Sequence, residues 1–270
     1  MSRFGGYEDQ AFLADYYDFV TPQRDVKFYV DYSRATRGMT LELACGTGRI
    51  LIPTTAAGCQ IVGLDHSEYM LARCREKLRK QPQEVQDRVR LVHTNMVAFD
   101  LGQTFSLITI PARSFQHLLG VDEQMSCLRC VHNHCELQAK LILEVFQVKP
   151  QMTYDPKYAR ESEGIPETKL PDGTKLRRTN RIAAFHRAQQ YNDVEIVYYV
   201  THPGGQTERL VQAFPFRYFF RCEMEHLLAR CGFRVVEIFG DFDKSPLTDD
   251  SREMIFVAEK GEHTGTGTGG

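Results

Sequence analysis

The feature that most constrains the fold of this chain is a short apolar strand that leads directly into a glycine loop. Residues 39–44 read Met-Thr-Leu-Glu-Leu-Ala, and Gly46 and Gly48 follow. Glycine at these two positions lets the backbone turn tightly and lets a ligand approach without a Cβ in the way. A strand, a glycine turn and a helix in this order are typical of α/β proteins that bind a nucleotide-like cofactor.

Strand-like and helix-like segments alternate through the first half of the chain. A helix predicted after Ser67 would bury Met70, Leu71, Cys74 and Leu78 at near-helical spacing. Because parallel strands are joined by crossover helices, the alternation predicts a doubly wound parallel sheet. Its further strands are expected at residues 61–64, 89–92, 107–110 and 141–146, with another helix at about 122–134.

The second half changes character. Residues 151–172 are polar and proline-rich, which predicts a loop or a mobile cap. Three long strand-like segments follow at 175–187, 194–202 and 207–214, and they predict an antiparallel sheet. The expected fold class is therefore α/β: a Rossmann-like sheet, mostly parallel with an antiparallel final strand, and an inserted antiparallel β cap.

The domain boundaries follow from these changes in pattern. We expect residues 1–260 to form a single domain and residues 261–270 to form a disordered tail, because the tail is glycine-rich and has no apolar side chain. Within the domain, we expect a cofactor-binding core at about 35–147, the cap at about 150–215, and a closing helix and strands at 216–260.

Charge and composition exclude several classes of protein. The chain has 33 Lys and Arg against 35 Asp and Glu, so it lacks the basic field that a nucleic-acid or membrane-surface binder needs. No apolar run approaches the roughly 20 residues that cross a bilayer, and residues 1–10 show no secretory signal. Eight scattered cysteines in a chain of 270 residues predict reduced thiols in a cytoplasmic protein.

Asp65 ends the second predicted strand, 17 residues after Gly48. A carboxylate at this point can accept two hydrogen bonds from a ribose diol. A dinucleotide and S-adenosylmethionine both fit such a site. The dinucleotide fingerprint is incomplete, because its third glycine is replaced by Leu51. A nicotinamide-dependent oxidoreductase is further disfavoured because no Lys stands four residues after Tyr154 or Tyr158 to complete a Tyr-x-x-x-Lys catalytic pair.

With these motifs the chain resembles the class I S-adenosylmethionine-dependent methyltransferases, and among them the small-molecule enzymes of the glycine N-methyltransferase type. The resemblance covers residues 10–147 by motif and 175–259 only in layout. Glu42 to Gly48 match the family's first motif, Asp65 its ribose-binding acid, and Asn95-Met96 the pair that meets the adenine. It implies S-adenosylmethionine as the cofactor, held by Tyr17, Arg24, Glu42, Ala44, Gly46, Gly48, Asp65, His66, Met70, Asn95, Met96, Pro111 and Ser114.

The same resemblance indicates where chemistry would occur. Residues 111–117 resemble the family's Asn-Ser-Phe-x-His run, which makes His117 the candidate catalytic residue, either as a group that orients the cofactor or as a general base. The glycine-methylating enzymes hold the substrate carboxylate with an Arg just after the fifth strand, where this chain has Phe146. Glycine is therefore a poor candidate substrate, and a less polar acceptor is expected. The candidate acceptor-binding residues are Arg113, Phe146, Tyr198 and Tyr218.

The sequence thus predicts methyl transfer from S-adenosylmethionine to a small-molecule acceptor, at an amine nitrogen or a hydroxyl. A nicotinamide-dependent oxidoreductase and a non-catalytic S-adenosylmethionine-binding protein remain as alternatives. Neither nucleic acid nor membrane is an expected partner, and the oligomeric state is left open, a homodimer included. No metal is expected, because the residues of the Cys127–Cys135 cluster lie on a predicted helix that packs on the sheet.

Overall fold

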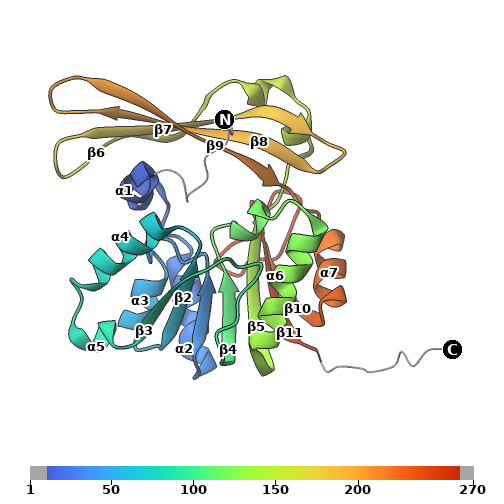
Figure 1. Cartoon of the computed structure of the whole chain (residues 1–270). Helices are drawn as coiled ribbons and strands as arrows, with labels where there is room; N and C mark the ends of the chain where they lie inside the picture. Colours follow the sequence, from blue (N-terminus) through green and yellow to red (C-terminus); the bar gives the residue numbers. More distant parts are fainter. Residues whose placement is uncertain (1–10, 262–270) are drawn as a thin grey trace.

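The computed structural model describes residues 11–261. The predicted disordered tail at 261–270 lies outside this range except for Gly261. A seven-stranded sheet with helices on both faces forms the lower part of the molecule in Figure 1, and a four-stranded antiparallel sheet lies above it. The predicted α/β class with an inserted antiparallel β cap is confirmed.

The core sheet has the strand order β10-β11-β5-β4-β1-β2-β3. Strands β1 to β5 run parallel, whereas β11 is antiparallel to both β5 and β10, as the sequence predicted for the final strand. The strands are β1 (Thr40–Leu43), β2 (Ile61–Asp65), β3 (Val89–His93), β4 (Phe105–Ile110), β5 (Cys135–Phe146), β10 (Phe233–Phe239) and β11 (Glu253–Lys260).

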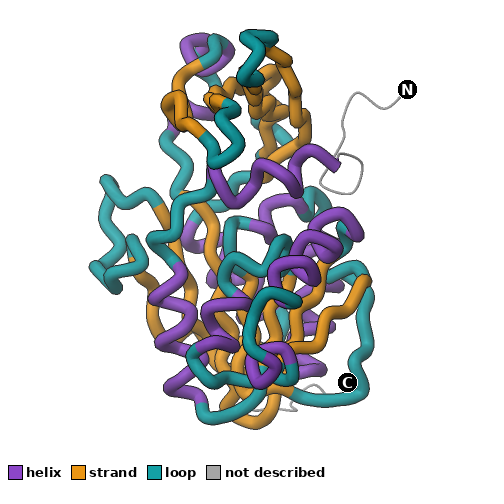
Figure 2. Tube along the Cα trace, turned by 90° about the vertical axis from the view of Figure 1, so that its left-hand side faces the viewer, coloured by secondary structure: helices purple, strands orange, loops and turns teal. Residues whose placement is uncertain are grey.

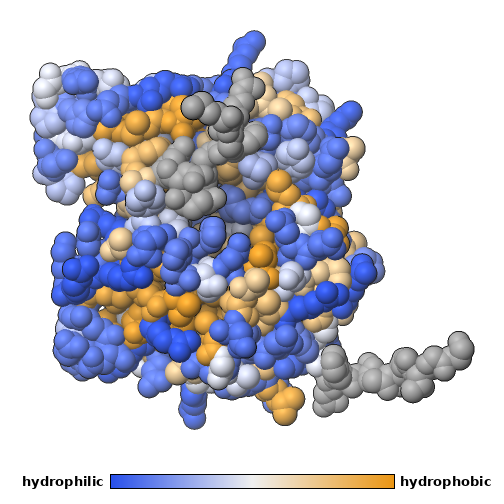
Figure 3. Space-filling view, viewed as in Figure 1, coloured by the Kyte–Doolittle hydropathy of each residue, from blue (hydrophilic) through white to orange (hydrophobic). Residues whose placement is uncertain are grey.

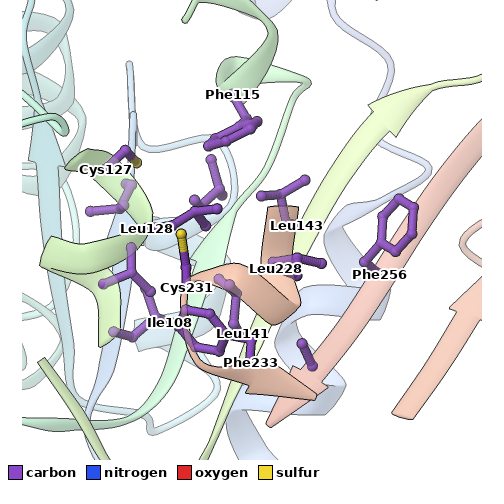
Figure 4. Packing of buried hydrophobic residues seen from close by; sticks show 14 of the residues in the cluster. Ile108, Phe115, Cys127, Leu128, Leu141, Leu143, Leu228, Cys231, Phe233 and Phe256 are labelled. Carbon is purple, nitrogen blue, oxygen red and sulfur yellow. The ribbon is translucent and has the colours of Figure 1, made fainter. Parts of the chain in front are cut away.

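Apolar side chains that alternate along these strands bury both faces of the sheet. On one face, α6 (Val121–His134) and α7 (Arg221–Arg230) cover a cluster that includes Ile108 and Leu141 (Figure 4). On the other face, α2 (Val26–Thr36) covers Leu107 and Ile142, the neighbouring residues along the same two strands. The remaining core helices are α3 (Leu51–Ala56), α4 (Glu68–Leu78) and α5 (Gln83–Gln86).

Local sequence signals account for the ends of several helices. The Ser67 side chain accepts a hydrogen bond from the Met70 backbone N–H and caps α4, as predicted. Helix α7 ends before Gly232, whose φ of +84° is the left-handed conformation that glycine adopts readily.

The cap consists of β6 (Ser162–Lys169), β7 (Lys175–His186), β8 (Tyr191–Thr201) and β9 (Thr207–Arg217), in that order. The prediction of a loop or mobile cap over residues 151–172 was wrong for β6, which pairs with β7. Most of its side chains are exposed, so this edge strand shows no apolar alternation along the sequence.

A register shift between Ile182 and Ala184 interrupts the alternation of side chains along β7. Strict alternation would place Arg177, Arg181 and Phe185 on one face of the strand. Because of the bulge, Phe185 pairs with Asn192 and moves to the opposite face.

The cap lies above the carboxyl ends of the parallel core strands, and α1 (Ala11–Val20) lies between α4 and the cap (Figures 1 and 2). In Figure 3 the top edge of the cap is mostly hydrophilic, whereas hydrophobic residues gather in a band across the core strands. The arrangement leaves the loops that follow the core strands facing the cap, which is where ligands bind in open α/β sheets.

Candidate active site

A cavity of about 530 Å³ lies between the carboxyl ends of the core strands and β9 of the cap. The loops after β1, β2, β3 and β4 form its floor, and α1 contributes one side. Ten of the residues predicted for the site line this cavity: Tyr17, Ala44, Gly46, Asp65, His66, Met70, Asn95, Met96, Ser114 and His117.

The two glycines of the loop after β1 have different surroundings. Both are left-handed, with φ of +55° at Gly46 and +79° at Gly48. A Cβ on Gly46 would meet nothing within 4 Å, whereas one on Gly48 would lie 2.6 Å from Cys74 Sγ. Gly46 therefore leaves open space beside the cavity, and Gly48 allows the loop to pack closely on α4.

Asp65 joins the glycine loop to the start of α4. Its Oδ2 accepts the Gly46 N–H at 2.7 Å, and its Oδ1 accepts the Ser67 N–H at 2.8 Å. Burial raises the pKa of Asp65 above its ordinary value, and these two hydrogen bonds only partly offset the effect. A carboxylate has about four acceptor positions, so both oxygens can still accept a hydrogen bond from a ligand hydroxyl.

The segment after β3 is held by a side chain of its own. Asn95 Oδ1 accepts the Val97 N–H at 3.0 Å, and this local turn places Asn95 and Met96 on the cavity wall. His66 and Met70 line the wall from the start of α4. The result is a partly apolar recess next to Asp65.

Helix α1 is fixed over the glycine loop by Asp18, which sequence reasoning did not single out. Asp18 Oδ1 accepts from the Thr47 hydroxyl at 2.6 Å, and Oδ2 pairs with Lys77 Nζ at 2.6 Å. These contacts bring Tyr17 to the cavity.

His117 lies on the short 3₁₀ turn after β4 (Ser114–His117) and reaches the cavity below the cap. Its ring lies 5.1 Å from the rings of both Phe214 and Phe216. Burial lowers the pKa of His117 to about 4, because the charged imidazolium is disfavoured away from water. The imidazole is therefore neutral at physiological pH.

Several predicted cofactor residues lie outside the cavity lining. Arg24 pairs with Asp241 at 3.0 Å and with Glu253, at the start of β11. Glu42 is buried in β1, and its Oε2 has no hydrogen-bond partner among the described residues. The Pro111 carbonyl accepts a hydrogen bond from the Ser114 hydroxyl at 2.8 Å.

The residues predicted for the acceptor also lie outside the lining. Arg113 Nη2 pairs with Glu253 Oε1 at 2.5 Å, and its guanidinium lies 5.8 Å from the Phe146 ring centroid. Phe146 stacks on Phe216 at 5.8 Å. Tyr198 and Tyr218 are buried, and Tyr198 belongs to an apolar cluster of the cap.

Comparison with known proteins identifies the fold and a known domain within the core sheet. Residues 40–137 match the family model described as "Methyltransferase domain". The chain carries a methyltransferase domain. Its architecture, a mostly parallel sheet with an antiparallel cap, matches the fold of solved methyltransferase structures.

Individual relatives match this chain over most of their length, by sequence or by structure. YqeM of Bacillus subtilis (strain 168), whose methyltransferase name is itself provisional, is 24% identical over 86% of this chain and 88% of its own. The CcbJ methyltransferase from Streptomyces caelestis superposes with a TM-score of 0.75, at 24% identity, over 95% of this chain and 98% of its own. CalS10, an amino pentose methyltransferase from Micromonospora echinaspora solved with S-adenosylmethionine bound, gives a TM-score of 0.69, 22% identity, and coverage of 96% and 99%.

Sequence reasoning missed the part of the methyltransferase cavity that the cap supplies. Gln212, Phe214 and Pro215 of β9 line it, together with Leu118 and Glu123 from the loop after β4 and the first turn of α6. The strand pattern predicted β9 correctly. It carried no signal for which of its residues faces the core, because the cap's position over the core depends on contacts distant in sequence.

Residues of the Cys127–Cys135 cluster take part in packing and in local hydrogen bonds. Cys127 lies in the apolar core shown in Figure 4. The Leu101 N–H donates to His134 Nε2 at 3.0 Å, so Nδ1 carries the proton and donates to the Cys130 carbonyl at 2.7 Å. Within residues 11–261, no group of three or more His, Cys, Asp or Glu could hold a metal ion. No helix in that range is long and apolar enough to cross a membrane.

Proposed function

We propose that this methyltransferase moves the methyl group of S-adenosylmethionine to the amine nitrogen of a small-molecule acceptor of the amino-sugar class. The observation that carries the proposal is a cavity with two unlike walls: a floor at the carboxyl ends of the core strands, where Asp65 adjoins a partly apolar recess, and an aromatic and amide-bearing roof from β9. The floor suits the cofactor, and the roof suits a second molecule.

The floor has the groups that S-adenosylmethionine requires. Asp65 keeps acceptor capacity for the two ribose hydroxyls, and Asn95 and Met96 border a recess that an adenine ring would fill. Gly46 leaves open space where the methionine part would pass the loop. The assignment follows the roles expected for these residues from the resemblance to the class I family.

The state of His117 favours an amine over a hydroxyl as the acceptor. A base with a pKa of about 4 gives little driving force for taking a proton from a hydroxyl. A neutral amine attacks the sulfonium methyl through its own lone pair and needs only to be held in line with it. His117 then serves as a neutral hydrogen-bonding group that orients the reactants.

The acceptor class rests on the roof and on the relatives. Phe146 stands where the glycine-methylating enzymes carry an Arg, and Arg113 is paired with Glu253, so neither offers a free cation to a substrate carboxylate. Phe214 presents an aromatic surface beside His117, a common way to hold the apolar face of a sugar ring. CalS10, similar in fold, is an amino pentose methyltransferase.

Turnover with matched acceptors tests this proposal. The purified protein is incubated with S-adenosylmethionine and a panel of methyl glycosides of amino sugars, each beside the analogue that carries a hydroxyl in place of the amine. We expect S-adenosylhomocysteine to form with at least one amine, faster as rising pH deprotonates that amine. Equal or faster turnover of the hydroxyl analogue would contradict the amine assignment.

A further inference from the structure

Gln212 is a buried amide for which residues 11–261 provide no hydrogen-bond partner. Its side chain is fully buried in the middle of β9, and neither Nε2 nor Oε1 has a partner among the described residues. Buried side-chain amides are nearly always paired, so an exception in a folded protein calls for a specific explanation.

The position of Gln212 supplies that explanation. It lines the cavity, as does Phe214 two residues further along β9. Its partner across the ladder is Ile196, and its neighbours on the same face of β9 are Leu210 and Phe214. The cap therefore surrounds the amide with apolar side chains on its own sheet and leaves the cavity as the place for a partner.

We infer that Gln212 is the residue that recognises the acceptor, by hydrogen bonding to a hydroxyl next to the amine that is methylated. The amide both donates and accepts, which matches a sugar hydroxyl, itself a donor and an acceptor. The inference rests on the proposed function for the nature of the acceptor. The floor of the cavity offers Asp65 and Asn95 to the cofactor, whereas Gln212 reaches the cavity from the cap.

A role of Gln212 in acceptor recognition predicts a change in the KM for the acceptor that a purely structural role would not produce. In Gln212→Met, a side chain of similar length replaces an unpaired buried amide, so the thermal midpoint of unfolding should be unchanged or higher. The KM for the best amino-sugar acceptor should rise about tenfold or more. The dissociation constant for S-adenosylmethionine, measured by calorimetry, should stay as in the wild type.

Two controls sharpen the experiment. Gln206→Met changes an exposed Gln just before the start of β9 and should alter none of the three quantities. An acceptor analogue whose neighbouring hydroxyl is replaced by hydrogen should be a poor substrate of the wild type. Gln212→Met should discriminate little between this analogue and the parent sugar, because the group that distinguishes them is gone.

The outcomes separate this inference from the proposed function. An unchanged KM in Gln212→Met, or a loss of S-adenosylmethionine affinity in that variant, would overturn the role of Gln212 in acceptor recognition. If the hydroxyl analogue proves to be the true substrate, the amine assignment fails. Gln212 is then judged by the KM of that analogue, with the same tenfold criterion.

Discussion

At the scale of single residues, Gly46 and Gly48 show how one residue type meets two requirements. Both carry a positive φ, so alanine at either costs about 1–2 kcal/mol from backbone strain. Only Gly48→Ala adds a steric conflict, because its Cβ would lie 2.6 Å from Cys74 Sγ. Gly46 instead adjoins open space beside the cavity.

We therefore expect the two alanine variants to differ in opposite directions in stability and in ligand binding. Gly48→Ala should lower the midpoint of urea unfolding more than Gly46→Ala does, whereas Gly46→Ala should weaken S-adenosylmethionine binding more in calorimetry. Equal effects of the two variants on stability and on binding would contradict the separate roles of Gly48 in packing and of Gly46 in leaving space for the ligand.

Glu42 gives a prediction about pH. Burial raises its pKa to about 8, and the nearby Arg49 only partly counteracts this. Between the ordinary value of 4.5 and about 8, the folded state keeps a proton that the unfolded chain has lost. The stability contributed by the neutral carboxyl is thus present at low pH and falls as pH rises through this window.

The Glu42→Gln variant should lack this part of the pH dependence. Urea unfolding should give it nearly wild-type stability below about pH 4.5 and a higher stability than the wild type above about pH 8. Glu144, whose pKa burial raises to about 7, titrates in both proteins and cancels in the difference. A stability difference that stays constant with pH would rule out a protonated Glu42 in the folded state.

At the scale of elements, Gln116 connects the core sheet to the cap. Its Nε2 donates to the Arg217 carbonyl at the end of β9 at 2.6 Å, and its Oε1 accepts the Phe146 N–H at the end of β5 at 2.8 Å. The side chain is fully buried, so its removal would leave two buried backbone groups unpaired.

We expect Gln116→Met to destabilise the protein by about 1–3 kcal/mol in urea unfolding. The exposed Gln83, whose amide donates to Asp87 just after the same short helix, provides the matched control, and Gln83→Met should change stability little. Wild-type stability in Gln116→Met would mean that other contacts hold the cap in place.

The elements also show where sequence reasoning succeeds and where it ends. Strands β1, β2, β4 and β5 were predictable because burial on both faces of a parallel sheet leaves continuous apolar runs. Strand β6 was not, because an exposed edge strand needs no such pattern. The bulge in β7 changes which face Phe185 occupies without any glycine or proline to announce it.

The same limit applies to the candidate site. The floor could be predicted because the glycine loop and Asp65 follow strands whose carboxyl ends meet at one edge of the sheet. Arg24 was expected at the cofactor, yet its partners Asp241 and Glu253 lie more than 200 residues away in sequence. Gln212 was not singled out, because a single Gln in an amphipathic strand gives no sign of lacking a partner.

At the scale of the whole molecule, the cavity exists only where the two sheets meet. The core supplies Asp65 and the glycine loop, and the cap supplies Gln212 and Phe214. If the floor holds the cofactor and the roof holds the acceptor, the sulfonium and the amine meet at the boundary between the two sheets, near His117. Binding of S-adenosylmethionine at the floor is the claim on which every later step depends.

The most direct test of that claim is calorimetric titration of the wild-type protein and of Asp65→Ala with S-adenosylmethionine, S-adenosylhomocysteine and NAD. The wild type should bind the first two ligands and not NAD. Asp65→Ala should lose about tenfold or more in affinity, because the ribose hydroxyls lose a charged hydrogen-bond acceptor. Binding of NAD, or unchanged affinity in a folded Asp65→Ala, would contradict the account.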